Sequence, residues 1–161
     1  MSAARLAAQC LDLLGPVDGP VTVVAPRAPR LAAALVAGGA AAADTAAPAA
    51  AVVVLLDVPA DPAARRAVLA AVGDRLPPGA PLLVVDHNQP RRAWRRVVAA
   101  MALLLRGVPP ARARYPTARE LAALGFGVER LRLGPGERVQ LVLCRVRTGR
   151  TTVSSDAPAD R

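Results

Sequence analysis

Hydrophobic and polar residues alternate with two different periodicities along this chain, and each periodicity predicts a different kind of secondary structure. Apolar residues at helical spacing predict helices over residues 3–14, 29–37, 62–76, 90–106 and 117–124. Short apolar runs rich in Val predict buried strands over 21–25, 51–56 and 82–85. Two alternating stretches predict an antiparallel hairpin over 128–133 and 138–147. The sequence therefore predicts an α/β fold with a mostly parallel sheet and a C-terminal antiparallel hairpin.

Local signals mark where two of these helices begin. Asp61 can cap the helix that follows it, and Pro62 suits the first helical position. That helix joins two apolar runs, so residues 51–85 form a predicted β-α-β unit with parallel strands. Thr117-Ala-Arg-Glu120 has the capping-box pattern and predicts the start of a short helix. The alanine-rich segment 40–50 has no assignment from its pattern, and a short edge strand is one interpretation.

The predicted helix over 90–106 has the clearest amphipathic pattern in the chain. Its apolar positions recur at helical spacing and are Trp94, Val97, Val98, Met101, Leu104 and Leu105. Its first turns carry Arg91, Arg92, Arg95 and Arg96. Positive charge there opposes the helix dipole, whose N-terminal end is already positive. Two interpretations stay open: a solvated face in an arginine-biased chain, or a contact with an anionic partner.

The length of 161 residues predicts one domain, over residues 1–147. Residues 148–161 are polar and without period, so they are predicted to be a disordered tail. No apolar run is long enough for a transmembrane helix, and the N-terminus has no continuous apolar signal segment. We therefore expect a cytoplasmic protein with no membrane partner.

The charge of the chain is carried by arginine alone. The net charge is +9, and the sequence contains no Lys, which excludes P-loop phosphate chemistry. Such a charge attracts polyanions, but only 2% of the residues are aromatic and no nucleic-acid module is recognisable. Nucleic-acid binding is therefore not expected. One histidine and two distant cysteines, Cys10 and Cys144, predict no metal site.

The strand, turn and helix over residues 21–37 have the order in which nucleotide-binding α/β proteins place a glycine-rich loop. This loop contains no glycine, and Pro26 and Pro29 stand in it instead. Proline fixes φ and has no backbone N–H to donate. The sequence therefore predicts the frame of a cofactor-binding domain without its usual phosphate- or cofactor-binding loop.

The C-terminal half carries the signature of a known family. Leu76-Pro-Pro-Gly79-Ala-Pro-Leu82-Leu-Val-Val-Asp86-His87 is a proline-glycine turn leading into a strand, and a helix ending in Gly125-Phe126 precedes the closing hairpin. In this the chain resembles the class I S-adenosylmethionine-dependent methyltransferases, of the small-molecule, type 11-like kind. The resemblance implies a shortened Rossmann-like sheet and, if the protein is active, S-adenosylmethionine as cofactor.

The N-terminal half departs from that family. Where the family has an acidic residue and a Gly-x-Gly turn, this chain has residues 23–29 without either. Gly38 and Ala51 are too close in sequence for the family's two further strand–helix units. Asp44 is the one candidate for a cofactor-binding residue, as a remnant of the family's adenine-contacting Asp. The cofactor-binding residues are otherwise unknown.

Candidate catalytic residues gather where two predicted neighbouring strands end. Asp57 follows one strand, and Asp86 and His87 end the next. Ligands of open α/β sheets bind beyond the carboxyl ends of the strands. His87 could act as a general base toward an acceptor hydroxyl, with Asp57 or Asp86 orienting it. The alternative is a polar strand-to-helix turn ahead of Pro90.

These observations lead to three functional hypotheses. The first is a methyltransferase-like pseudoenzyme that has lost S-adenosylmethionine binding, needs no cofactor and acts through protein contacts, either as a homo-oligomer or with a protein partner. The second is an active S-adenosylmethionine-dependent small-molecule methyltransferase with an atypical cofactor loop. The third is an arginine-rich binder of an anionic partner.

Overall fold

The computed structural model describes residues 2–41, 47–56, 61–105, 107–111, 116–134 and 137–147. Its helices and strands, in chain order, are α1 (Ala3–Leu14), β1 (Val21–Val24), α2 (Pro29–Ala37), β2 (Ala50–Val54), α3 (Pro62–Arg75), β3 (Pro81–His87), α4 (Ala93–Leu104), α5 (Thr117–Ala123), β4 (Phe126–Leu133) and β5 (Val139–Val146). Each element predicted from the periodicity of the sequence is present.

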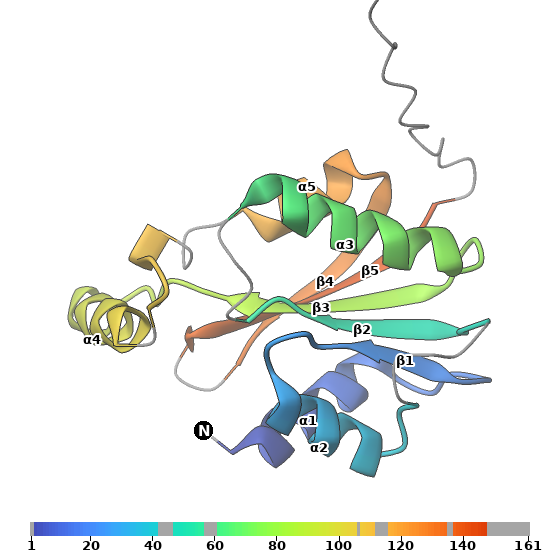
Figure 1. Cartoon of the computed structure of the whole chain (residues 1–161), viewed down its shortest axis with the longest axis horizontal. Helices are drawn as coiled ribbons and strands as arrows, with labels where there is room; N and C mark the ends of the chain where they lie inside the picture. Colours follow the sequence, from blue (N-terminus) through green and yellow to red (C-terminus); the bar gives the residue numbers. More distant parts are fainter. Residues whose placement is uncertain are drawn as a thin grey trace, which may run out of the picture.

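The strands form one sheet in the order β1-β2-β3-β5-β4. β1, β2 and β3 are parallel, while β5 is antiparallel to both β3 and β4. Helices α1 and α2 lie on one side of the sheet, and α3 and α5 lie on the other (Figure 1). The predicted α/β class, the parallel β2–α3–β3 unit and the closing antiparallel hairpin are confirmed.

Strand β2 lies between two hydrophobic clusters, which explains its unbroken run of apolar residues. Val52 and Val54 belong to the cluster beneath α1 and α2. Ala51 and Val53 face the opposite way and belong to the cluster beneath α3 and α5. Because side chains alternate across a strand, a strand covered on both faces needs an apolar residue at every position.

Helix α3 begins as the sequence predicted. The Asp61 side chain accepts hydrogen bonds from the backbone N–H groups of Ala63 (2.9 Å) and Ala64 (3.4 Å). Pro62 stands at the first helical position, where its missing N–H costs nothing. Leu69 and Val72 are buried against the sheet.

Helix α5 does not begin with the predicted capping box. Its N-cap residue is Pro116, with no side-chain capping bond, and Thr117 is already the first helical residue. The Thr117 hydroxyl donates instead to Asp86 Oδ2, at 2.7 Å. Glu120 pairs with Arg65 of α3, at 3.2 Å. Both side chains have partners on other elements, so the capping-box prediction was wrong.

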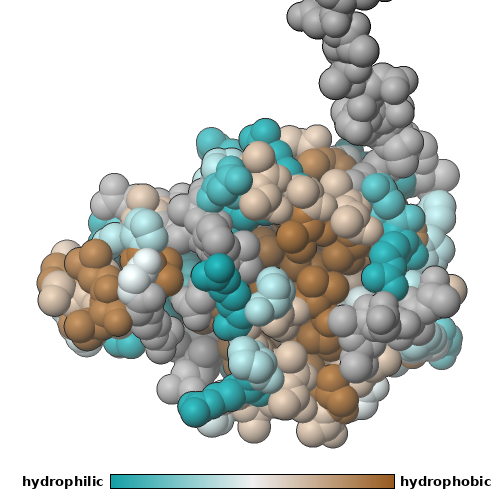
Figure 2. Space-filling view, in the orientation of Figure 1, coloured by the Kyte–Doolittle hydropathy of each residue, from teal (hydrophilic) through white to brown (hydrophobic). Residues whose placement is uncertain are grey.

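Helix α4 stands apart from the sheet, beyond the strand ends (Figure 1). Its buried side consists of Ala99 and Leu103. Its large apolar residues are exposed instead, and we call them the α4 apolar face: Trp94, Val97, Val98, Met101, Leu104 and Leu105. Figure 2 shows hydrophobic residues gathered over this helix. Among the described residues, no helix is long and apolar enough to cross a membrane.

Parts of the sequence prediction concern residues that the structure does not describe. Asp44, Asp57 and the predicted tail 148–161 lie outside the described residues. The possible edge strand at 40–50 is described in part. Ala41 forms an isolated parallel bridge with Thr22, and its N–H donates to the carbonyl of Val21 at 2.8 Å.

Candidate functional site

A cavity of about 980 Å³ lies at the carboxyl ends of the parallel strands, between α1, α2 and α4. It is the place where ligands bind in open α/β sheets. Its lining includes Leu56 just after β2, His87 at the end of β3, and Trp94 and Leu103 of α4. Helix α4 forms one wall of the cavity through Ala99, Ala102 and Leu103, and of the α4 apolar face only Trp94 belongs to the lining.

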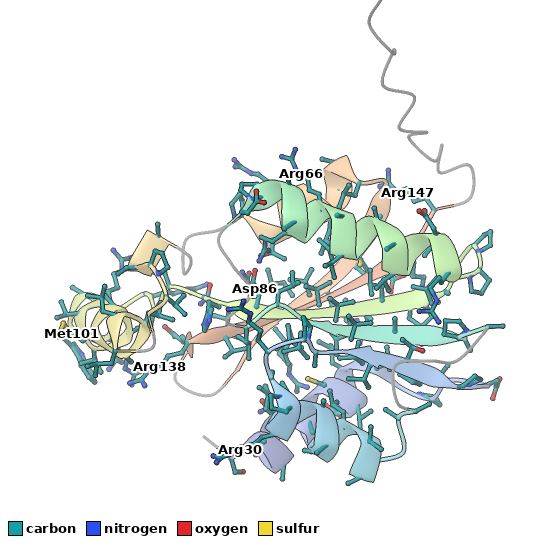
Figure 3. The ribbon with its side chains drawn as sticks, viewed as in Figure 1. Arg30, Arg66, Asp86, Met101, Arg138 and Arg147 are labelled. Carbon is teal, nitrogen blue, oxygen red and sulfur yellow. The ribbon has the colours of Figure 1, made fainter. Side chains whose placement is uncertain are left out.

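The cavity has an apolar floor and a basic rim. The buried apolar residues of its lining are Leu6, Leu31, Ala99, Leu103 and Val139. The arginines of its lining are Arg5, Arg27, Arg30, Arg95 and Arg138. Figure 3 shows Arg30 beside α2 and Arg138 just below α4, both at this end of the molecule. Arg95 also lies over the ring of Trp94, with its guanidinium carbon 5.2 Å from the ring centre.

The turn between β1 and α2 offers few backbone donors to a ligand. Pro26 and Pro29 have no N–H, and the N–H of Ala28 donates to the Ala25 carbonyl at 3.3 Å. Ala28 caps α2 without a side-chain hydrogen bond. Between Pro26 and Arg30, only the N–H groups of Arg27 and Arg30 remain for a bound molecule. The proline-rich turn thus has the poor donor supply that its sequence predicted.

His87 lies at the cavity as predicted, but it is nearly buried. It ends β3, is 6% exposed, and belongs to the cavity lining. Its backbone carbonyl accepts a hydrogen bond from Gln140 Nε2 at 3.0 Å, which fixes the end of β3 to β5. A general-base role for His87 stays a prediction, with the imidazole placed where an acceptor in the cavity could be reached.

Asp86 points to the other side of the sheet, into a buried polar cluster. Its carboxylate accepts from Arg65 Nη2 at 2.8 Å, from the Thr117 hydroxyl at 2.7 Å and from the His87 backbone N–H at 2.8 Å. Arg65 and Asp86 are both 0% exposed. Asp86 is therefore held by α3 and α5, away from the cavity. Its predicted role in orienting His87 stays a prediction, since the bond between them runs through the backbone.

Sequence reasoning missed most of this cluster. Arg65, Thr117, Glu120 and Gln140 come from α3, α5 and β5, and each bonds to another member. Arg65 stands four residues before Leu69 and seven before Val72, on the buried face of α3, whereas its neighbour Arg66 is off that face. This helical spacing is the signal in the sequence that could have identified the buried arginine. A buried charge needs a buried partner, and that partner is 21 residues away.

The two cysteines are inert components of the core. Cys10 lies on the buried face of α1 and Cys144 lies on β5, and both are 0% exposed. Burial raises the pKa of each thiol from 9.0 to about 12, and at Cys144 the charge of Glu129 adds to this. Neither is a nucleophile at neutral pH. Among the described residues, no group of three or more His, Cys, Asp or Glu side chains could hold a metal ion.

No family model matches the chain, and no curated protein does. Solved methyltransferases match its fold. The mitomycin 7-O-methyltransferase MmcR superposes with a TM-score of 0.63 at 19% identity, over 90% of this chain and 53% of that one. The glycopeptide N-methyltransferase MtfA, complexed with sinefungin, gives 0.61 at 18% identity, over 91% and 94%. Human N-acetylserotonin methyltransferase, in complex with S-adenosylmethionine, gives 0.60 at 13% identity, over 90% and 52%.

The chain spans little more than half the length of MmcR (53%) and of the human enzyme (52%). At such identities the likeness concerns the fold and not the activity. The order of the strands, the cavity beyond their carboxyl ends and these superpositions agree with one another. The chain has the Rossmann-like fold of the class I S-adenosylmethionine-dependent methyltransferases, in a shortened form.

Proposed function

We propose that this chain is a methyltransferase-like domain that does not bind S-adenosylmethionine and that acts by binding another protein through the α4 apolar face. The observation that carries the proposal is that face. Trp94 of α4 is 61% exposed, and Leu105, which caps the end of that helix, is 85% exposed. Contiguous exposed apolar surface of this kind marks protein interaction sites.

The energetic argument favours a covered face. Fully burying a large apolar side chain contributes about 1.5–3 kcal/mol, so a partially exposed one forgoes roughly 1 kcal/mol. Six such side chains share the α4 apolar face. A partner that covers them would recover several kcal/mol, which is enough to stabilise a complex after the cost of association.

Charge indicates what kind of protein the partner is. Arg91, Arg92 and Arg96 stand at the start of α4, none of them in an ion pair within the part of the chain that the structure describes, and the whole chain carries a net charge of +9. A second copy would bring the same positive charges to the interface. An apolar groove with an acidic rim complements both the face and its arginines. We therefore infer a partner protein of that chemistry.

The loss of the cofactor is supported by the cavity. S-adenosylmethionine carries a sulfonium and an ammonium against one carboxylate, so its net charge is positive. Arg27 and Arg30 stand beside the β1–α2 turn, and no carboxylate of the described residues lines the cavity. The turn has only two N–H groups left to donate to a ligand. Each hydrogen bond that the ligand loses in this way costs about 1 kcal/mol of binding free energy. These residues do not fit the cofactor, and no methyl-transfer step is derived from them.

Calorimetric titration tests the cofactor half of the proposal. We expect no isotherm when S-adenosylmethionine, or its demethylated product, is titrated at micromolar concentrations. An active S-adenosylmethionine-binding methyltransferase, titrated alongside, controls for ligand quality. Binding in the micromolar range would overturn this half and favour the second candidate function, an active methyltransferase with an atypical loop. The position of His87 in the cavity lining is the observation in its favour.

The partner half is tested with a charged substitution on the helix. The variant Val97→Asp/Leu104→Asp should lose the partner that the wild-type chain recovers from its native cells, while Arg119→Asp/Arg130→Asp, on other exposed surfaces, should keep it. The proposal is supported if the recovered protein, once purified, binds the wild type but not the Val97→Asp/Leu104→Asp variant. Its binding to the wild type should also weaken at high salt. Two other outcomes would overturn the proposed partner. If the wild type self-associates by light scattering and the variant does not, the face binds a second copy. If the wild type binds vesicles of anionic lipid and the variant does not, the face binds a membrane surface.

A further inference from the structure

The rim of the cavity carries charge of one sign. Its five arginines come from separate parts of the chain: α1, the β1–α2 turn, α2, α4 and the residue before β5. No Asp or Glu among the described residues belongs to the lining. Like charges around one concavity repel each other, and low-dielectric walls strengthen the field inside it. The described lining of the cavity thus favours an anion over a cation.

Several arginines outside the cavity lining have carboxylate partners. Arg65 pairs with Asp86 at 2.8 Å, Arg132 with Asp12 at 2.6 Å, and Arg145 with Glu129 at 2.7 Å. Within the described residues, no ion pair joins a rim arginine to a carboxylate. The rim arginines are therefore available to an anion from outside the chain.

The floor of the cavity is apolar and selects the rest of the ligand. Leu31 and Leu103 are buried in the lining, and the Trp94 ring stands at its edge. A free inorganic anion would leave this floor in contact with water. An amphiphilic anion would place its apolar body on the floor and its charged group among the guanidinium groups, which bind carboxylate and phosphate oxygens through paired N–H donors.

We propose that this cavity binds a small anionic molecule with an apolar body, namely a carboxylate, phosphate or sulfonate attached to an aromatic or acyl group. The inference rests on the proposed function in one respect, that S-adenosylmethionine does not fill the same cavity. Arg30 of α2 and Arg138 before β5 both belong to the lining and are the arginines that hold the anionic group.

Trp94 makes the proposal measurable, because it is the only tryptophan of the chain and it lines the cavity. The probe is anilinonaphthalene sulfonate, an aromatic anion whose fluorescence rises in apolar sites. The full chain is titrated, and energy transfer from Trp94 to the probe reports binding near the cavity. Phenylnaphthylamine, which has the same rings and no sulfonate, is the neutral control.

Two matched variants separate the rim from the general charge of the protein. Arg30→Gln/Arg138→Gln removes two rim charges, and Arg119→Gln/Arg130→Gln removes two exposed charges outside the lining. The rim variant should bind the anionic probe about tenfold more weakly, because it loses two guanidinium groups that can pair with the sulfonate. The control variant should bind it as the wild type does. The neutral probe should bind all three proteins equally.

Each contrary result has a definite meaning. Equal weakening in the two variants would show attraction to net charge, and equal affinity for both probes would show an apolar site with no anion preference. Either would overturn the proposal. Probe binding that Val97→Ser/Leu104→Ser abolishes would place the probe on the α4 apolar face, and would overturn it too. If S-adenosylmethionine displaces the probe while the rim variant still weakens it, the proposed function fails and the anion preference stands.

Discussion

Helices α3 and α4 both follow a strand of the parallel sheet, yet they use their side chains in opposite ways. Helix α3 contains few large apolar residues, and it packs on the sheet and buries an arginine, Arg65. Helix α4 has a well-formed apolar stripe, and it stands beyond the sheet with that stripe exposed. An amphipathic pattern thus shows that a face is suited to burial, but it does not show which molecule buries it.

The largest expected effect comes from removing the buried charge of α3. Arg65→Met should lower the free energy of unfolding by about 3–5 kcal/mol, because it leaves Asp86 and Glu120 buried without their cation. Arg66→Met is the matched control. That side chain is 64% exposed and its pair with Glu120 is long, at 4.0 Å, so the loss should stay below about 1 kcal/mol. Chemical denaturation measures both.

A further variant sharpens this result. Adding Asp86→Asn and Glu120→Gln to Arg65→Met removes the uncompensated carboxylates and should recover part of the lost stability. If Arg65→Met is no more destabilising than Arg66→Met, the cluster does not hold α3 to the sheet and the contrast between the two helices loses its basis.

The next effect concerns the pH dependence of the packed core. Because burial raises the pKa of Cys10 and Cys144 from 9.0 to about 12, the folded chain keeps these protons at pH values where the unfolded chain has lost them. Their contribution to stability is complete below pH 9 and is lost as the pH rises toward 12. Each pKa unit corresponds to about 1.4 kcal/mol, so the two thiols together should cost about 3 kcal/mol by pH 10.

The double variant Cys10→Ala/Cys144→Ala isolates that contribution, since its unfolding free energy should fall less between pH 8 and pH 10.

Thiol labelling at pH 8 compares the packed core with the exposed face of α4. The native cysteines should react only on unfolding, whereas a cysteine introduced by Leu105→Cys should react at once, because position 105 is 85% exposed. Rapid labelling of the native thiols would contradict their burial.

The smallest expected effect is on α4 itself. Val97→Ser/Leu104→Ser should change the free energy of unfolding of the isolated chain by less than about 0.5 kcal/mol for each site, as exposed positions do. Leu69→Ala on α3, where the side chain is fully buried, should cost about 2–5 kcal/mol. Thermal or urea unfolding compares the two. A large loss in the α4 variant would mean that its apolar face packs within the chain.

The fold was predictable where local patterns and tertiary packing agree. The Val-rich run of β2 and the Asp61 cap of α3 both appear in the structure as the sequence indicated. The capping box at Thr117 failed because its hydroxyl has a better partner 31 residues away, in Asp86. The local sequence allowed the capping bond. The Thr117 hydroxyl bonds to Asp86 instead, because a buried carboxylate needs hydrogen-bond donors.

The candidate site was predictable only in part. The rule that ligands bind beyond strand ends placed His87 at the cavity, and the glycine-free turn indicated a poor cofactor loop. The basic rim was not foreseen, because Arg5, Arg27, Arg95 and Arg138 are far apart in a chain with 21 basic residues. Only the fold brings them together, and in so basic a sequence no single arginine is conspicuous.

Strand order also has a consequence for how the chain is made. The last strand, β5, lies between β3 and β4, so β4 has no place in the sheet until β5 has entered it. While the ribosome is still adding residues before Val139, the exposed edge of β3 presents Leu82, Val84 and unpaired backbone groups to the cell. The sheet can close only once β5 (Val139–Val146) has been made, and until then the nascent chain has an edge that other strands could join.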